Sequence, residues 1–137
     1  MKNNQYKVEI TVDGQKKHAQ IEGRTLLVDF LRDTAGETSV KIGCEEGACG
    51  ACTVDLDGKT AKSCLQLAIN CDGSEIRTVS SLRNKSKLGL LQQAFIDSHA
   101  LQCGFCTSGM LMSAEAFLQK NTDTDFTEND IKEALTG

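Results

Sequence analysis

The cysteines carry the chemistry of this sequence, and four of them have a spacing typical of one kind of metal site. Four residues separate the first from the second, two separate the second from the third, and the fourth follows later in the chain. They are Cys44, Cys49, Cys52 and Cys64. The order C-x4-C-x2-C…C binds a 2Fe-2S cluster through four thiolates. The spacing therefore predicts a cluster that passes electrons one at a time.

Glycines are interleaved with the first three cysteines. Gly43, Gly47 and Gly50 lack a Cβ atom, so their backbone can adopt positive φ angles and approach a cluster closely. A loop of this kind can point its backbone N–H groups at sulfur. We expect those groups to stabilise the negative charge of the site.

Zinc and disulfides are the two other common uses of such cysteines. A structural zinc site usually presents two short C-x2-C pairs on separate turns, whereas residues 41–54 contain one such pair. Disulfide scaffolds are denser in cysteine and usually hold an even number, whereas this chain has 7 cysteines in 137 residues. Both comparisons favour iron-sulfur chemistry.

A second pair of cysteines, Cys103 and Cys106, forms a C-x2-C turn just before a helix predicted over residues 107–120. The free N–H groups and the dipole at a helix N-terminus favour negatively charged sulfur. We therefore expect two more metal ligands at this turn. Cys71 has no neighbour at a metal-binding spacing, and we interpret it as a small buried apolar residue.

The acidic and imidazole side chains give no catalytic site. We interpret Glu45 and Glu46 as solvated charges beside the cluster and His18 as a solvent-facing strand residue. The sequence contains no nucleophile-base pair, phosphate-binding loop or pair of catalytic carboxylates. We therefore predict no catalytic residue in this chain.

Local patterns predict the elements that position the first cysteine loop. Apolar and polar residues alternate in residues 8–12 and again in residues 16–21, and the Asp-Gly pair between them predicts a β-hairpin. From Thr25, the expected N-cap, the period changes to that of a helix that ends by Gly36. A hairpin, a helix and then the cysteine loop is the order expected of a β-grasp fold.

A second hairpin is predicted after the loop, where residues 53–56 and 59–63 flank another Asp-Gly turn. This hairpin would return Cys64 to the first three cysteines. Residues 75–79 are predicted to form a final strand.

After about residue 80 the sequence becomes helical in pattern. We expect helices over residues 88–100, 107–120 and 128–135. Leu90 and Leu91 are expected on an apolar face of the first of these helices, and Met110 and Met112 in the core below the second. Thr127 begins a capping-box pattern that opens the third.

Composition excludes several other classes of protein. The net charge of −4, the absence of Trp and the single Tyr argue against a nucleic-acid-binding surface. The sequence has no apolar span of 18 residues and no signal-peptide pattern, so we expect no membrane contact and a cytoplasmic location. A reducing compartment also keeps thiols free for metal.

Residues 41–54, Cys64 and residues 100–110 together resemble the small iron-sulfur subunit of the molybdenum hydroxylases. This family includes xanthine dehydrogenase, carbon monoxide dehydrogenase and aldehyde oxidoreductase. The resemblance covers nearly the whole chain, and both cysteine motifs occur in the family's order.

The resemblance implies an α+β chain with two domains. Residues 1–80 would form a β-grasp, plant-type ferredoxin-like domain and residues 81–137 an all-helical bundle, each holding one 2Fe-2S cluster. The chain would be an oxidoreductase subunit without a substrate site of its own. It would relay electrons from a molybdopterin-binding large subunit to a FAD-binding medium subunit or to another acceptor.

The resemblance also implies roles for individual residues. The ligands of the cluster nearer the flavin would be Cys44, Cys49, Cys52 and Cys64. Cys103 and Cys106 would supply half of the ligands of the cluster nearer molybdenum, and Gln102 would contact the molybdopterin. The family has a further Cys-x-Cys pair soon after a segment like residues 131–137. Either a C-terminal segment with that pair is missing from this sequence, or the second cluster is absent, or another chain completes it; we expect the missing segment.

A free-standing, single-cluster ferredoxin-like carrier is the main alternative function, and a zinc-binding interaction module is a weaker one. A small carrier has no need of a helical half with the Gln-Cys-Gly-Phe-Cys motif of residues 102–106. The sequence therefore favours the subunit of a larger oxidoreductase.

Overall fold

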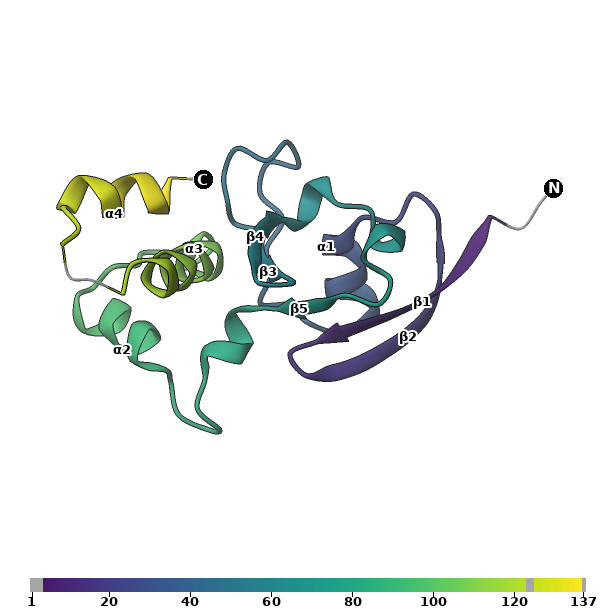
Figure 1. Cartoon of the computed structure of the whole chain (residues 1–137), viewed down its shortest axis with the longest axis horizontal. Helices are drawn as coiled ribbons and strands as arrows, with labels where there is room; N and C mark the ends of the chain where they lie inside the picture. The colour runs from purple at the N-terminus through teal and green to yellow at the C-terminus, as the bar shows by residue number, and fades with distance from the viewer. Residues whose placement is uncertain (1–3, 123–124, 137) are drawn as a thin grey trace.

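The computed structural model describes residues 4–122 and 125–136, and within them a strand-rich half precedes a helical half (Figure 1). The described strands form one five-stranded sheet with the order β2-β1-β5-β3-β4. Their bounds are β1 Gln5–Val12, β2 Gln15–Glu22, β3 Thr53–Leu56, β4 Lys59–Lys62 and β5 Glu75–Arg77. The predicted α+β class is confirmed.

The first hairpin forms as the alternation predicts. β1 and β2 are antiparallel, and the turn between them places Asp13 and Gly14 at φ angles of 48° and 79°. The inward face of β1 is almost fully buried through Val8, Ile10 and Val12. The second predicted hairpin, β3 and β4, is also present and antiparallel.

Strand β5 lies at the centre of the sheet, parallel to β1 and antiparallel to β3. It is shorter than the predicted strand of residues 75–79. The chain turns into a 3-10 turn, Val79–Leu82, because the Thr78 hydroxyl accepts a hydrogen bond from the backbone N–H of Ser80 and caps that turn.

The predicted first helix is present, but it begins at α1, Leu27–Asp29, with Leu26 and not Thr25 at the N-cap. The reason is a contact with a distant segment. Thr25 O accepts a hydrogen bond from Ala68 N at 2.8 Å, and Leu27 N donates to Gln66 O at 2.7 Å. The backbone of Thr25 is therefore used in strand-like pairing and cannot cap the helix.

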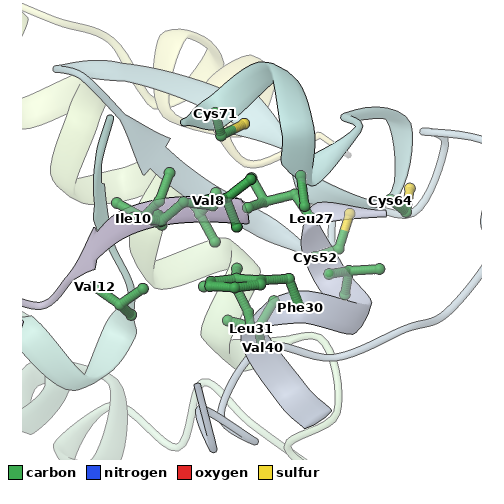
Figure 2. Close-up of a cluster of buried hydrophobic side chains, with 14 of the residues drawn as sticks. Val8, Ile10, Val12, Leu27, Phe30, Leu31, Val40, Cys52, Cys64 and Cys71 are labelled. Atoms are coloured by element: carbon green, nitrogen blue, oxygen red, sulfur yellow. The ribbon is translucent and has the colours of Figure 1, made fainter. Parts of the chain in front are cut away.

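The same helix continues with wider turns. Residues Phe30–Thr34 are π-helical, and Ala35 N closes the last turn by donating to Phe30 O at 2.9 Å. Phe30 and Leu31 are both fully buried. Figure 2 shows the Phe30 ring in the middle of the core, between Val8 and Ile10 on one side and Leu31 and Val40 on the other.

The helices of the second half match two of the three predictions at their bounds. They are α2 Leu90–Asp97, α3 Thr107–Lys120 and α4 Glu128–Leu135. Helix α2 is shorter than predicted, whereas Thr127 caps α4 as expected by accepting a hydrogen bond from Asp130 N at 3.3 Å. Helix α3 lies between the sheet and the other two helices (Figure 1). None of the described helices is long and apolar enough to cross a membrane.

The predicted apolar faces of this half are partly wrong. Leu90, the first residue of α2, is 95% exposed, and it follows Gly89, whose backbone lies against the carbonyl oxygen of Leu82. Leu91 is half-buried. In α3, Met112 is buried as predicted, whereas Met110 is half-buried.

Candidate metal centre

The first cysteine loop has an irregular backbone that its glycines make possible. Gly47 and Gly50 have φ angles of 82° and 71°, as predicted for a loop that wraps a cluster. Gly43 does not have a positive φ. Its missing side chain leaves room for Cys49, because a Cβ atom at position 43 would lie 2.7 Å from Cys49 Sγ. Glu45, with φ 57°, also adopts the left-handed conformation.

The fold brings the four predicted ligands of this loop together as two pairs. Near the surface, the Cys49 backbone N–H donates to Cys44 Sγ at 3.3 Å. At the edge of the core, the thiols of Cys52 and Cys64 interact with each other and are only 2% and 4% exposed. Figure 2 shows these two buried sulfur atoms near each other at one end of the core.

Hydrogen bonds make the thiol of Cys44, one of the outer pair, acidic. Backbone N–H groups, first that of Glu46 and then those of Cys49 and Ala48, lower the pKa of Cys44 to about 6 from its ordinary value of 9.0. A thiolate is the form of cysteine that binds metal. The loop therefore holds Cys44 in the metal-binding form near neutral pH.

Burial has the opposite effect on Cys64, one of the inner pair. It raises the pKa of the Cys64 thiol to about 11, and the neighbouring Cys52 thiol adds to the shift, while the Gly47 N–H opposes it. A bound metal deprotonates a coordinating thiol outright. Cys64 would therefore release its proton when metal binds.

The second hairpin returns Cys64 to the loop, as the sequence predicted. Cys64 lies in a 3-10 turn, Ser63–Leu65, directly after β4. The Ser63 hydroxyl fixes this turn by donating to Cys52 O at 2.7 Å. That buried hydrogen bond holds the two inner cysteines in one arrangement.

The donor set fits a 2Fe-2S cluster, which takes four thiolates. In residues 4–122 and 125–136, no group of three or more His, Cys, Asp or Glu side chains converges closely enough to hold a single metal ion. A two-iron cluster shares its four thiolates between two metals, so it does not require such convergence. Two pairs of thiols beside a loop lined with N–H groups can supply two thiolates to each iron of such a cluster.

The second predicted site lies at the start of α3. Cys106 is the N-cap residue of this helix, and Gly104, at φ 79°, turns the chain between Cys106 and Cys103. Both thiols are exposed, and so is the neighbouring Gln102. These two cysteines are half of a four-thiolate set.

The remaining candidate residues lie as interpreted. Cys71 is buried in the core of the sheet half, with its sulfur 3.6 Å from Leu67 O. His18 is exposed on β2, with Nδ1 3.3 Å from the Glu9 carboxylate, and the Glu45 and Glu46 side chains are exposed.

Sequence reasoning missed two residues that contact the first loop. Gly109 of α3 is buried against Gly50, and Leu65 lies on Gly47. A glycine inside a helical pattern usually has a packing reason, so Gly109 carried a signal. Leu65 carried none, because a single leucine after a cysteine has no distinctive pattern.

Comparison with known proteins assigns both halves of the chain. Residues 10–79 match the 2Fe-2S iron-sulfur cluster binding domain, and residues 78–137 match the [2Fe-2S] binding domain. The predicted 2Fe-2S cofactor is thereby confirmed. The second match also favours the two-cluster subunit over the free-standing, single-cluster carrier.

Relatives similar to this chain are subunits of oxidoreductases. The chain is 47% identical to the caffeine dehydrogenase subunit gamma of Pseudomonas sp. (strain CBB1), with 95% of this chain and 78% of that subunit covered. It is 43% identical to the nicotine 6-hydroxylase small subunit of Paenarthrobacter nicotinovorans, over 98% and 80%. It is 42% identical to the xanthine dehydrogenase iron-sulfur-binding subunit of Escherichia coli O157:H7, over 95% and 81%.

Solved structures agree with the sequence relatives. A chain of quinoline 2-oxidoreductase from Pseudomonas putida 86 has a TM-score of 0.85 and 37% identity, covering 98% of this chain and 92% of that one. Aldehyde oxidoreductase from Desulfovibrio gigas has a TM-score of 0.85 and 36% identity, covering 94% of this chain and 14% of that one.

The chain belongs to the family of small iron-sulfur subunits of the molybdenum hydroxylases. It is the electron-transfer subunit of an oxidoreductase of this kind, and it works with a larger molybdenum-binding partner.

Proposed function

We propose that the three cysteines of the first loop and the one in the turn after β4 ligate one 2Fe-2S cluster: Cys44, Cys49, Cys52 and Cys64. The observation that carries this assignment is the placement of these four thiols as two pairs at a loop whose backbone N–H groups lower the pKa of Cys44 to about 6. When bound, the cluster supplies the ability to accept and donate one electron at a time.

The protein's own residues hold and shield this site. The N–H groups of Glu46, Cys49 and Ala48 offset negative charge on the outer sulfur, Cys44. The inner sulfurs are buried against the core and are fixed by the Ser63 hydroxyl. The outer side of the loop is open, because Cys49 is exposed, and an electron acceptor can approach it there.

Cys103 and Cys106 are proposed as two ligands of a second 2Fe-2S cluster, whose other ligands come from outside the described residues. Their exposure at the N-terminus of α3 supports this role, since such a position is open to a partner. The exposed Gln102 is proposed to contact the molybdopterin of the large subunit.

The relay is proposed to run from molybdopterin through the helical half, residues 81–137, to the ferredoxin-like half, residues 1–80. A FAD-binding medium subunit is the proposed acceptor. We place the assembly in the cytoplasm, because none of the seven cysteines forms a disulfide in the structure and a reducing compartment keeps thiols available for metal.

The first test is iron and acid-labile sulfide per chain, with an EPR spectrum of the reduced complex purified anaerobically with its partners. Two loaded clusters would give about four irons per chain and two distinct signals. Zinc without iron would overturn the proposal.

Matched variants assign the signals. Cys49→Ser is expected to remove one EPR signal and Cys103→Ser the other. Cys71→Ser is the control, because Cys71 is buried away from both sites and should leave both signals in place. Loss of a signal in Cys71→Ser, with an unchanged spectrum in Cys49→Ser, would overturn the ligand set.

A further inference from the structure

Leu65 follows Cys64 and lies directly on the cysteine loop. A Cβ atom at Gly47 would lie 2.5 Å from Leu65 Cδ1 and 3.4 Å from its Cγ. The isobutyl group therefore rests on the Gly47 backbone without a side chain between them. The outer face of Leu65 is open to solvent, since the residue is 56% exposed.

The part of the loop beneath Leu65 serves the proposed cluster site. The backbone N–H of Gly47 donates to the Cys64 thiol. Gly47 also has a φ of 82°, so the loop turns sharply at this point. Leu65 thus lies between solvent and the backbone that supports one of the two inner sulfurs.

The position of Leu65 is fixed from both sides. The Ser63 hydroxyl donates to Cys52 O at 2.7 Å, and Leu27 N donates to Gln66 O at 2.7 Å. The backbone on each side of Leu65 is therefore anchored to the fold. These anchors place the Leu65 side chain over the loop.

Stability of the core does not account for an apolar side chain here, because more than half of Leu65 remains exposed. An apolar shell around a metal site controls the access of water, and with it the reduction potential. We propose that Leu65 is a cover over the cysteine loop that limits the access of water and small reagents to the first cluster and keeps its reduction potential low. This inference rests on the proposed ligand set of that cluster.

The direction of the effect follows from electrostatics. Reduction adds one negative charge to the site. Water stabilises added charge better than a hydrocarbon side chain does. Removing the cover should therefore favour the reduced state and raise the potential, and it should also open a path for chelators.

The experiment uses the anaerobically purified complex and three variants. Leu65→Ala removes the cover, Leu65→Met keeps an apolar side chain of similar size, and Leu90→Ala makes the same truncation at an exposed leucine of α2. Two quantities are measured for each: the midpoint potential of the EPR signal that Cys49→Ser removes, and the rate of iron release to bathophenanthroline disulfonate.

Leu65→Ala is expected to raise the potential and to release iron several-fold faster, while Leu65→Met and Leu90→Ala stay close to wild type. A Leu65→Ala protein that matches Leu90→Ala in both quantities overturns the inference. Faster iron release without a change in potential also overturns it, because it indicates a loosened fold and not a lost cover.

Failure of this inference is distinguishable from failure of the proposed function. A wild-type complex without iron contradicts the ligand set itself. If the wild type holds iron and Leu65→Ala changes neither the potential nor the rate of iron release, only the role of Leu65 is contradicted. If Leu65→Ala does not fold, Leu65→Val shortens the cover by one methylene group. The potential of this variant must then rise by a smaller amount for the inference to stand.

Discussion

The backbone of Gly109 in α3 lies against the carbonyl oxygen of Gly50 so closely that a Cβ atom at position 109 would lie 1.9 Å from that oxygen. Gly50 follows Cys49 in the first loop, and Gly109 lies about one helical turn after Cys106. The two cysteine sites are therefore joined through a direct backbone contact. No side chain separates them at this point.

Gly109→Ala should separate the two halves, because the obstructing atom is a backbone oxygen that cannot rotate away. We expect a loss of about 1–3 kcal/mol in the free energy of unfolding, as for overpacking elsewhere. The magnetic interaction between the two EPR signals should also weaken.

Ser108→Ala is the matched control for Gly109→Ala. Its hydroxyl is buried without a hydrogen-bond partner among the described residues, so removing it should leave stability unchanged or raise it. Equal effects of the two substitutions on urea unfolding would contradict the role of the Gly109 contact.

Gly47→Ala and Gly14→Ala compare two glycines with nearly equal φ angles, 82° and 79°. Each should cost about 1–2 kcal/mol of stability, because a Cβ atom is strained in the left-handed region. A Cβ at position 14 meets nothing within 4 Å, whereas one at position 47 displaces Leu65. Only Gly47→Ala should therefore release iron faster, and equal release rates from the two variants would count against the cover.

The metal-free, reduced protein should have a stability that depends on pH in two steps. The pKa of Cys44 is lowered to about 6, so between about pH 6 and pH 9 the unfolded chain binds the extra proton and stability rises with pH. The pKa of Cys64 is raised to about 11, so above pH 9 the folded chain holds the extra proton and stability falls.

Urea unfolding midpoints between pH 5.5 and about pH 10.5 measure both steps. Cys44→Ser should abolish the rise below pH 9 and leave the fall above it. A midpoint that does not change across this range would show that the loop N–H groups do not hold Cys44 as a thiolate in solution.

Asp13→Asn should weaken the attachment of the first hairpin to the segment that leads into the helical half. The Asp13 carboxylate accepts hydrogen bonds from Thr78 N at 2.7 Å and Thr78 Oγ1 at 2.6 Å. Asparagine tolerates the φ of 48° but replaces one acceptor oxygen with a donor. We expect a loss of about 1–3 kcal/mol, the range for hydrogen bonds to a charged group.

A double-mutant cycle with Thr78→Val isolates this contact. If the carboxylate acts through Thr78, the two substitutions together should cost less than the sum of their separate effects. Strict additivity of the two changes would assign the Asp13 effect to some other part of the turn.

Features determined by short-range patterns could be predicted from the sequence. The two Asp-Gly hairpins and helices α3 and α4 follow from periodicity and capping, and the cysteine motifs follow from spacing alone. The predicted N-cap of the first helix was wrong, because the backbone of Thr25 is hydrogen-bonded to Ala68, which is distant in the sequence. Local helix propensity does not include a competing hydrogen bond from a distant segment.

The candidate site was predictable in its donors but not in its surroundings. The spacing of Cys44, Cys49 and Cys52 indicates the ligands, but it does not show that Cys52 is buried while Cys49 is exposed. That difference arises from packing of the loop against the core. The contact of Leu65 with Gly47 likewise depends on how the second hairpin folds back.

Strand β5 has a consequence for the biosynthesis of this protein. It is the last strand of the described sheet to leave the ribosome, yet it occupies the central position between β1 and β3. Until Arg77 has emerged, the two hairpins cannot join, and the loop that carries the first cysteines has no finished core to rest on. Delivery of iron and sulfide to this half of the chain should therefore come after β5 has emerged and completed the sheet.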